Sequence, residues 1–154
     1  MAKSSGFLAS NNNGAQMRLA NKVAVVTGAG AGIGRAIAER FGREGASVIV
    51  ADIDPVTGAD TARCIRDEGG EALFLQTDVT NELQIKTMAQ QTLEQFKRAD
   101  ILCNNAAILL THEERRAHEL TNETWDRTMA VNLRGYWLCS KYILPAMLRQ
   151  GGGS

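Results

Sequence analysis

From residue 23 the chain reads Val23-Ala-Val-Val-Thr-Gly28-Ala-Gly30-Ala-Gly32-Ile-Gly34, a β-branched apolar run that breaks into alternating glycines. The apolar run has no polar face, which is typical of a strand that helices cover on both sides of a parallel sheet. The glycines predict a tight turn, and the residues after them enter a helical pattern. A helix that starts here directs unpaired N–H groups and the positive end of its dipole at the turn. The stretch therefore predicts strand, turn and helix N-terminus, an arrangement that attracts a pyrophosphate.

Three glycines of the turn have distinct expected roles. Gly28 lets the backbone turn without a Cβ penalty, Gly32 lets phosphates approach the main chain, and Gly34 lets the helix sit close to the strand. The frame G-x-x-x-G-x-G fits these positions, whereas G-x-G-x-x-G does not, because Ile33 occupies the place of its third glycine. A Walker A loop is excluded because no Gly-Lys-Ser/Thr follows. Taken alone, the glycines leave open a turn that binds nothing.

Length and composition indicate one globular domain. The chain has 154 residues, of which 44% are hydrophobic and 22% charged, which is enough to bury a core. Lys+Arg and Asp+Glu both count 17, so the charge balance favours neither nucleic acid nor a membrane as partner. The sequence lacks a membrane-spanning apolar run and a signal-peptide core, so we expect a cytoplasmic protein. Residues 1–18 are expected to form a disordered tail, and residues 19–154 the domain.

The thiols and histidines do not predict a metal site. Cys64, Cys103 and Cys139 are odd in number and widely spaced, which indicates reduced thiols, with a reactive or metal-binding cysteine as the alternative. His112 and His118 lie in a polar segment of alternating charge, and their spacing does not place them on one helical face. We therefore expect that segment to be a solvated loop.

The second apolar strand, over residues 48–51, ends at a carboxylate. Asp52 lies where a dinucleotide-binding fold places the acid that hydrogen-bonds the adenosine ribose. This carboxylate would repel a 2′-phosphate, and its neighbours Ala31 and Ile53 carry no charge to attract one, so the predicted cofactor is NAD. The alternative is that Asp52 only begins the next turn, because Asp54 followed by Pro55 is a ready helix start.

The remaining pattern repeats strand and helix, which predicts an α/β fold with a doubly wound parallel sheet. Strands are expected over residues 72–75 and 100–103, and helices after the glycine turn as far as Gly45, over 56–68, from the capping pair Asn81 and Gln84 onward, and over 123–148. The apolar stripe expected to face the sheet from the first helix is Ile33, Ala36, Ile37 and Phe41. The packing face expected of the last helix is Trp125, Met129, Leu133, Tyr136, Ile143 and Met147.

One polar residue interrupts the packing face of the last helix. Asn132 carries an amide that must find partners if it is buried, or cost roughly 1–3 kcal/mol. Its position indicates either a structural bond to a neighbouring loop or a role in the site.

Together with Asp52, the segments Thr27–Gly34, Asp78-Val79, Asn104–Ala107 and Val131-Asn132 resemble the classical short-chain dehydrogenase/reductase family in order and spacing. The resemblance spans residues 19–154 and implies a Rossmann-type NAD-binding domain with strand order 3-2-1-4. It also implies hydride transfer between NAD(H) and a secondary alcohol or ketone. The implied cofactor-binding residues are Gly28, Gly30, Gly32, Ile33 and Gly34 at the pyrophosphate, Asp52 and Ile53 at the adenosine ribose, Asp78 and Val79 at the adenine, and Asn105, Ala106, Ala107 and Val131 toward the other ribose. The implied catalytic residue is Asn132, which holds a water in the family's proton relay.

The sequence departs from the family pattern in two ways. Ala107 stands where the family usually has glycine. The family's catalytic serine and Tyr-x-x-x-Lys pair have no counterpart, because Ser140 follows Tyr136 by four residues and Ala146 follows Tyr142 by four. The chain therefore resembles the N-terminal part of such an enzyme, about four strands long and inactive alone.

Three functions are compatible with the sequence. The first is the cofactor-binding portion of an oxidoreductase, with an open edge on the fourth strand and self-association through the last helix. The alternative is a non-catalytic NAD-binding or interaction module. The third is a methyltransferase, since a related Gly-rich turn between strand and helix binds S-adenosylmethionine, but Asn104–Ala107 and Asn132 argue against it.

Overall fold

The computed structural model describes residues 17–109, 116 and 118–154. Most of the expected tail and of the polar segment, including His112, lies outside these residues. The strands are β1 Val23–Thr27, β2 Ser47–Asp52, β3 Glu71–Gln76 and β4 Ile101–Cys103. The helices are α1 Gly32–Arg43, α2 Pro55–Asp67, α3 Glu82–Phe96, α4 Asn122–Met129, the π-helical segment η1 Ala130–Gly135 and α5 Tyr136–Arg149.

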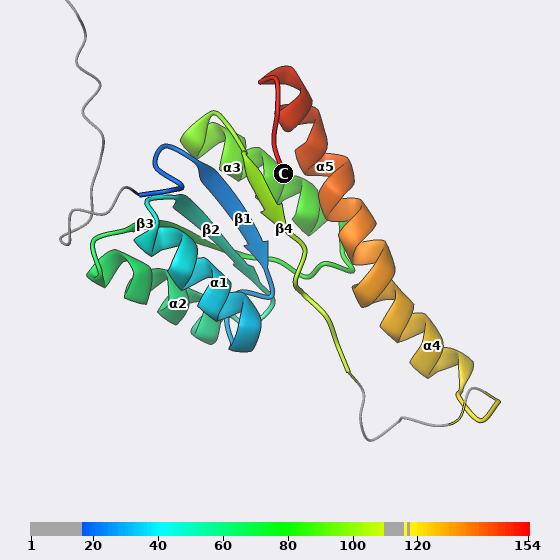
Figure 1. Cartoon of the computed structure of the whole chain (residues 1–154). Helices are drawn as coiled ribbons and strands as arrows, with labels where there is room; N and C mark the ends of the chain where they lie inside the picture. Colours follow the sequence, from blue (N-terminus) through cyan, green and yellow to red (C-terminus); the bar gives the residue numbers. More distant parts are fainter. Residues whose placement is uncertain (1–16, 110–115, 117) are drawn as a thin grey trace, which may run out of the picture.

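The described strands form one parallel sheet in the order β3-β2-β1-β4, as predicted (Figure 1). Helices cover both of its faces. Val25 and Ile49 point to the side of α3 and α5, while Val26 and Val48 point to the side of α1 and α2. Because successive side chains of a strand alternate between the faces, a strand covered on both sides must be apolar throughout, and all of β1 is buried.

The predicted packing stripe of α1 was correct for only half of its residues. Ile37 and Phe41 pack against the core, but Ile33 is 74% exposed and Ala36 is also exposed. The residues that α1 buries are Gly34, Ala38 and Gly42. Small residues replace large ones here because α1 lies very close to the sheet and to α2. A Cβ on Gly42 would come within 2.6 Å of Ile65 Cγ2.

The predicted last helix is continuous but not uniform. It passes from α4 through the π-helical segment η1 into α5, an irregularity that the sequence pattern did not predict. Its packing face was wrong at Trp125 and Leu133, which are 53% and 65% exposed, and correct at Ile143 and Met147. Trp125 is exposed because α4 extends beyond the sheet, while α5 packs against it (Figure 1); Leu133 lies in η1, between the two.

The free edge of β4 is partly paired. After α5, Gly151 takes a φ of +88° and turns the chain back toward the sheet. Ser154 then donates its N–H to the Asp100 carbonyl at 2.9 Å and accepts from the Leu102 N–H at 2.8 Å. This is parallel pairing on the side of β4 opposite β1, so the edge that was expected to be open is paired between Asp100 and Leu102.

A membrane-crossing helix is absent from the described part of the chain, where every helix is too short or too polar.

Candidate functional site

A cavity opens at the carboxyl ends of the strands. Its volume is about 440 Å³, within the range of roughly 300–1,000 Å³ that is usual for small-molecule sites. It gathers twelve of the predicted cofactor residues, namely Gly28, Gly32, Ile33, Gly34, Asp52, Ile53, Asp78, Val79, Asn105, Ala106, Ala107 and Val131. Gly30 and Asn132 do not line it. Ala31, Thr77 and Ile108 do, although they were not predicted as binding residues; their proximity to the motifs was the only available signal.

A second cavity of similar volume, about 430 Å³, lies at the amino ends of the strands. Lys22, Arg98 and Ser154 are among its lining residues, and it contains none of the predicted site residues. The two volumes are too similar to identify the site. Its position does, because ligands of open parallel sheets bind at the carboxyl ends of the strands.

The glycine turn has the predicted geometry. Gly28 and Gly32 have φ values of +63° and +53°, in the left-handed region that favours glycine. A Cβ on Gly34 would overlap the Gly28 carbonyl, so only glycine lets α1 begin this close to β1. A Cβ on Gly32 would meet nothing within 4 Å, so this main chain is open toward the cavity.

Thr27 ties the end of β4 to the end of β1. Its Oγ1 accepts from the N–H groups of Asn105 and Ala106, both at 3.1 Å, and the Asn105 Nδ2 donates to the carbonyls of Thr27 and Gly28 at 3.0 and 3.2 Å. The side-chain nitrogen of Asn105 is thus bonded within the protein. Asn105 shapes the cavity wall and leaves Ala106 and Ala107 along the opening.

Two backbone amides fix the Asp52 carboxylate at the edge of the cavity. Oδ2 accepts from the Gly30 N–H at 2.7 Å, and Oδ1 accepts from the Asp54 N–H at 2.9 Å. Asp54 in turn caps α2, because its Oδ1 accepts from the Val56 N–H at 2.8 Å. Asp52 therefore orders the turn before α2, as the alternative interpretation expected, and it also lines the cavity; its bond to the adenosine ribose stays a prediction.

The loop after β3 is ordered by its own polar groups. Asp78 Oδ1 accepts from the N–H and the hydroxyl of Thr80, both at 2.8 Å, and the Asp78 N–H donates to Gln84 Oε1 at 2.8 Å. The predicted capping box is half correct: Asn81 Oδ1 accepts from the N–H groups of Leu83 and Gln84 and so caps α3, whereas the Gln84 side chain accepts from the Asp78 N–H and not from the Asn81 N–H. Val79 is 8% exposed and lines the cavity beside Asp78.

Asn132 lies within the π-helical segment η1, and its amide holds the loop after β4. Its Oδ1 accepts from the Ile108 N–H and its Nδ2 donates to the Ile108 carbonyl, both at 2.9 Å. This is the structural bond to a neighbouring loop that the sequence allowed. The role in a proton relay stays a prediction.

Within the described residues, groups of three or more His, Cys, Asp or Glu side chains that could hold a metal ion are absent. The three cysteines are free thiols. Burial raises the pKa of the Cys139 thiol to about 11, which makes it inert at neutral pH.

Comparison with known proteins agrees with this geometry. Residues 22–154 match the family model described as short chain dehydrogenase. The uncharacterized oxidoreductase YxbG of Bacillus subtilis is 45% identical over 135 residues, covering 88% of this chain and 49% of that protein. The NAD-dependent glycerol dehydrogenase of Listeria innocua is 38% identical over 135 residues, covering 88% of this chain and 51% of that protein.

A solved structure shows the same fold. The hydroxysteroid dehydrogenase of Escherichia coli superposes with a TM-score of 0.82 at 32% identity, covering 89% of this chain and 57% of that chain. The chain spans about half the length of the curated relatives described above. Sequence match, strand order and cavity agree, and the chain belongs to the short-chain dehydrogenase family.

Proposed function

We propose that this chain binds NAD and supplies the cofactor-binding portion of an oxidoreductase that moves hydride between NAD(H) and a secondary alcohol or ketone. One observation carries the choice of NAD: the Asp52 carboxylate, fixed by the amides of Gly30 and Asp54, lies at the cavity beside uncharged Ala31 and Ile53. A ribose 2′-hydroxyl can donate to this carboxylate. A 2′-phosphate would meet a like charge there.

The start of α1 fits a pyrophosphate. Its N-cap is Ala31, which makes no side-chain capping bond, and its first turn holds no acidic residue. In contrast, α2, α3 and α4 are capped by Asp54, Asn81 and Thr121. The first N–H groups of α1 therefore keep their capacity to bind an anion, and the open face of Gly32 lets it approach.

The other predicted residues take places around this anchor. Asp78 and Val79 would border the adenine, and Ala106, Ala107 and Val131 would border the nicotinamide ribose. Asn105 would act through the loop that it holds, and Asn132 through Ile108 and through a bound water of the proton relay. NAD, when bound, supplies the hydride acceptor.

The substrate class and setting complete the proposal. An alcohol or ketone is supported by relatives whose names include a glycerol dehydrogenase and a cis-4-hydroxycyclohexanecarboxylate dehydrogenase. A cytoplasmic setting is supported by the free thiols, since reducing compartments keep cysteines unpaired.

Calorimetric titration with NAD and NADP tests the proposal. We expect NAD to bind, NADP to bind at least ten-fold more weakly, and Asp52→Ala to narrow that gap. Asp126→Ala, on exposed α4, serves as the control and should behave as the original chain. If a folded sample binds neither nucleotide, or if Asp52→Ala leaves the gap unchanged, the proposal is wrong.

The second candidate is an interaction module that pairs through the last helix. An apolar depression of about 330 Å³ lies on η1 and α5 between Leu133 and Trp137, which are 65% and 57% exposed. Exposed apolar surface of this kind favours association with a second copy. Sedimentation should show a dimer or larger assembly that Trp137→Glu converts to monomer, whereas a monomeric original chain at all concentrations would exclude this candidate.

A further inference from the structure

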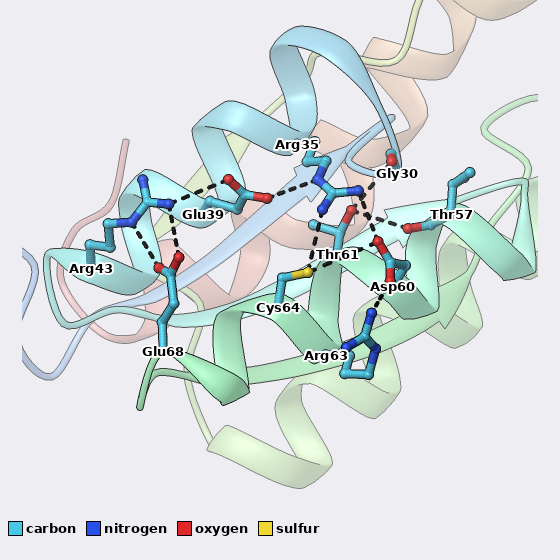
Figure 2. A network of polar contacts seen from close by, with 10 residues as sticks. All are labelled: Gly30, Arg35, Glu39, Arg43, Thr57, Asp60, Thr61, Arg63, Cys64 and Glu68. Atoms are coloured by element: carbon cyan, nitrogen blue, oxygen red, sulfur yellow. Dashed lines mark hydrogen bonds and ion pairs between the residues drawn. The ribbon is translucent and has the colours of Figure 1, made fainter.

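One face of α2 contacts the glycine turn at Gly30 and the first turn of α1 at Arg35 (Figure 2). The residues on this face are Thr57, Asp60, Thr61 and Cys64, and residues three or four positions apart, such as 57 and 61 or 60 and 64, are neighbours on one side of a helix. None of them lines the cavity. The cofactor residues predicted from sequence did not include any of them.

Gly30 lies between this face and Asp52. Its N–H donates to Asp52 Oδ2 at 2.7 Å, and its carbonyl accepts from Thr61 Oγ1 at 3.3 Å. The single Thr61 hydroxyl hydrogen is shared with the Thr57 carbonyl at 3.1 Å. A Cβ on Gly30 would lie 2.6 Å from Thr57 Oγ1 and 2.9 Å from Asp52 Cγ, so the backbone is enclosed on both sides.

The same face of α2 also holds the first turn of α1. Arg35 follows Gly34 directly, and its guanidinium donates to Asp60 Oδ2 at 3.0 Å and to Cys64 Sγ at 3.3 Å (Figure 2). Hydrogen bonds from Arg63 and Arg35 hold the pKa of the Asp60 carboxyl below its usual value, so the pair is ionised at neutral pH. Helix α2 thus fixes the start of α1 as well as Gly30.

We propose that Thr61 is a positioning residue for cofactor choice: by holding the Gly30 carbonyl it keeps the Gly30 amide on Asp52 and thereby maintains the preference for NAD over NADP. The inference rests on the proposed function, because it concerns the same site. Thr61 is fully buried and does not line the cavity, so it acts through Gly30 and Asp52.

The physical reason is the loss of rotational freedom at Asp52. A carboxylate whose two oxygens are both held by amides cannot turn aside to admit a 2′-phosphate, and it is already oriented for a ribose hydroxyl. Without the Thr61 bond, Gly30 can shift and release Oδ2. The carboxylate then loses orientation for NAD and gains room to avoid the phosphate of NADP.

The test compares Thr61→Val with Thr92→Val by calorimetric titration of the whole chain with NAD and with NADP. Thr92 is a matched control, since it is equally buried and its hydroxyl also donates to the carbonyl four residues earlier, that of Met88, at 2.8 Å. Only Thr61 has the additional bond to Gly30. We expect Thr61→Val to weaken NAD binding about five-fold, the effect of one typical hydrogen bond, with no equal loss for NADP.

Two further variants make the outcome decisive. Thr61→Ser keeps the hydroxyl and should restore the NAD/NADP ratio of the original chain. Gly30→Ala places a Cβ 2.9 Å from Asp52 Cγ, so it should displace the carboxylate and lower the NAD/NADP ratio. It provides the test of the inference if Thr61→Val does not fold. Equal ratios in Thr61→Val and Thr92→Val, or in Gly30→Ala and the original chain, would overturn the inference while NAD binding itself stands. Absence of NAD binding to the folded original chain would overturn the proposed function and this inference with it.

Discussion

Replacing Asn132 should destabilise the chain by a predictable amount. The Asn132 amide makes two hydrogen bonds of 2.9 Å to the half-buried backbone of Ile108, and Asn132→Ala removes both. Each such bond contributes a net 0.5–1.5 kcal/mol, so the free energy of unfolding should fall by about 2 kcal/mol. For a chain of this length, that corresponds to a decrease in Tm of about 6 °C.

Thermal unfolding followed by circular dichroism measures this effect, with two comparisons that isolate the amide. Asn122→Ala, at the exposed start of α4, should melt within about 1 °C of the original chain. Asn132→Asp keeps an acceptor for the Ile108 N–H but places a second oxygen against the Ile108 carbonyl, so its Tm should fall at least as far as that of Asn132→Ala. If Asn132→Ala melts together with Asn122→Ala, the two bonds do not hold the loop and the reasoning is wrong.

Three other measurements test the glycine turn, the buried carboxylate of Asp100 and the buried thiol of Cys139. Gly34→Ala should lower the free energy of unfolding by at least 2 kcal/mol, because its Cβ overlaps the Gly28 carbonyl across the turn. Gly32→Ala should lower it by only about 1 kcal/mol, because of the φ of +53°, yet it should block nucleotide binding. Equal denaturant midpoints for the two variants would contradict this contrast. Burial opposes ionisation of Asp100, but hydrogen bonds from Arg98 and a backbone amide outweigh it and hold the pKa of that carboxyl below its usual value of 3.8. Its stabilising effect is therefore complete above pH 3.8 and is lost as the pH falls through the folded-state pKa, so the stability deficit of Asp100→Asn at pH 7 should shrink in acid; a constant deficit down to pH 2 would refute the assignment. Cys139, whose thiol pKa burial raises to about 11, should resist iodoacetamide at pH 8 until the chain unfolds, which mass spectrometry of the alkylated peptides would show; rapid labelling of the folded chain would refute the burial.

Local patterns in the sequence predicted the architecture well. The apolar runs without a polar face predicted strands buried on both sides, and their alternation with helical periods predicted a parallel sheet. The glycine spacing predicted the turn, because positive φ and close approach of main chains each demand glycine. Asp52, at the end of its strand, was placed correctly at the cavity edge.

Helix faces were predicted less well, because periodicity shows which residues share a side but not whether anything covers it. Ile33 belongs to an apolar stripe, yet it lines the cavity and is 74% exposed. Trp125 follows the same period as Ile143, but the sheet does not extend far enough to cover α4, and Leu133 of η1 is exposed as well. The π-helical segment around Asn132 also has no signal in the helical period.

The sequence by itself determined the glycine turn and the acid beside it, because each depends on residues close together in the chain or on motif spacing, and the family resemblance implied the strand order. Only the tertiary structure decided which side chains hold that site in shape. Thr27 bonds to the backbone of Asn105, Thr61 to Gly30, and Asn132 to Ile108. These partners are separated by 24 to 78 residues, and a hydrogen bond across such a distance exists only after the sheet and its helices have packed.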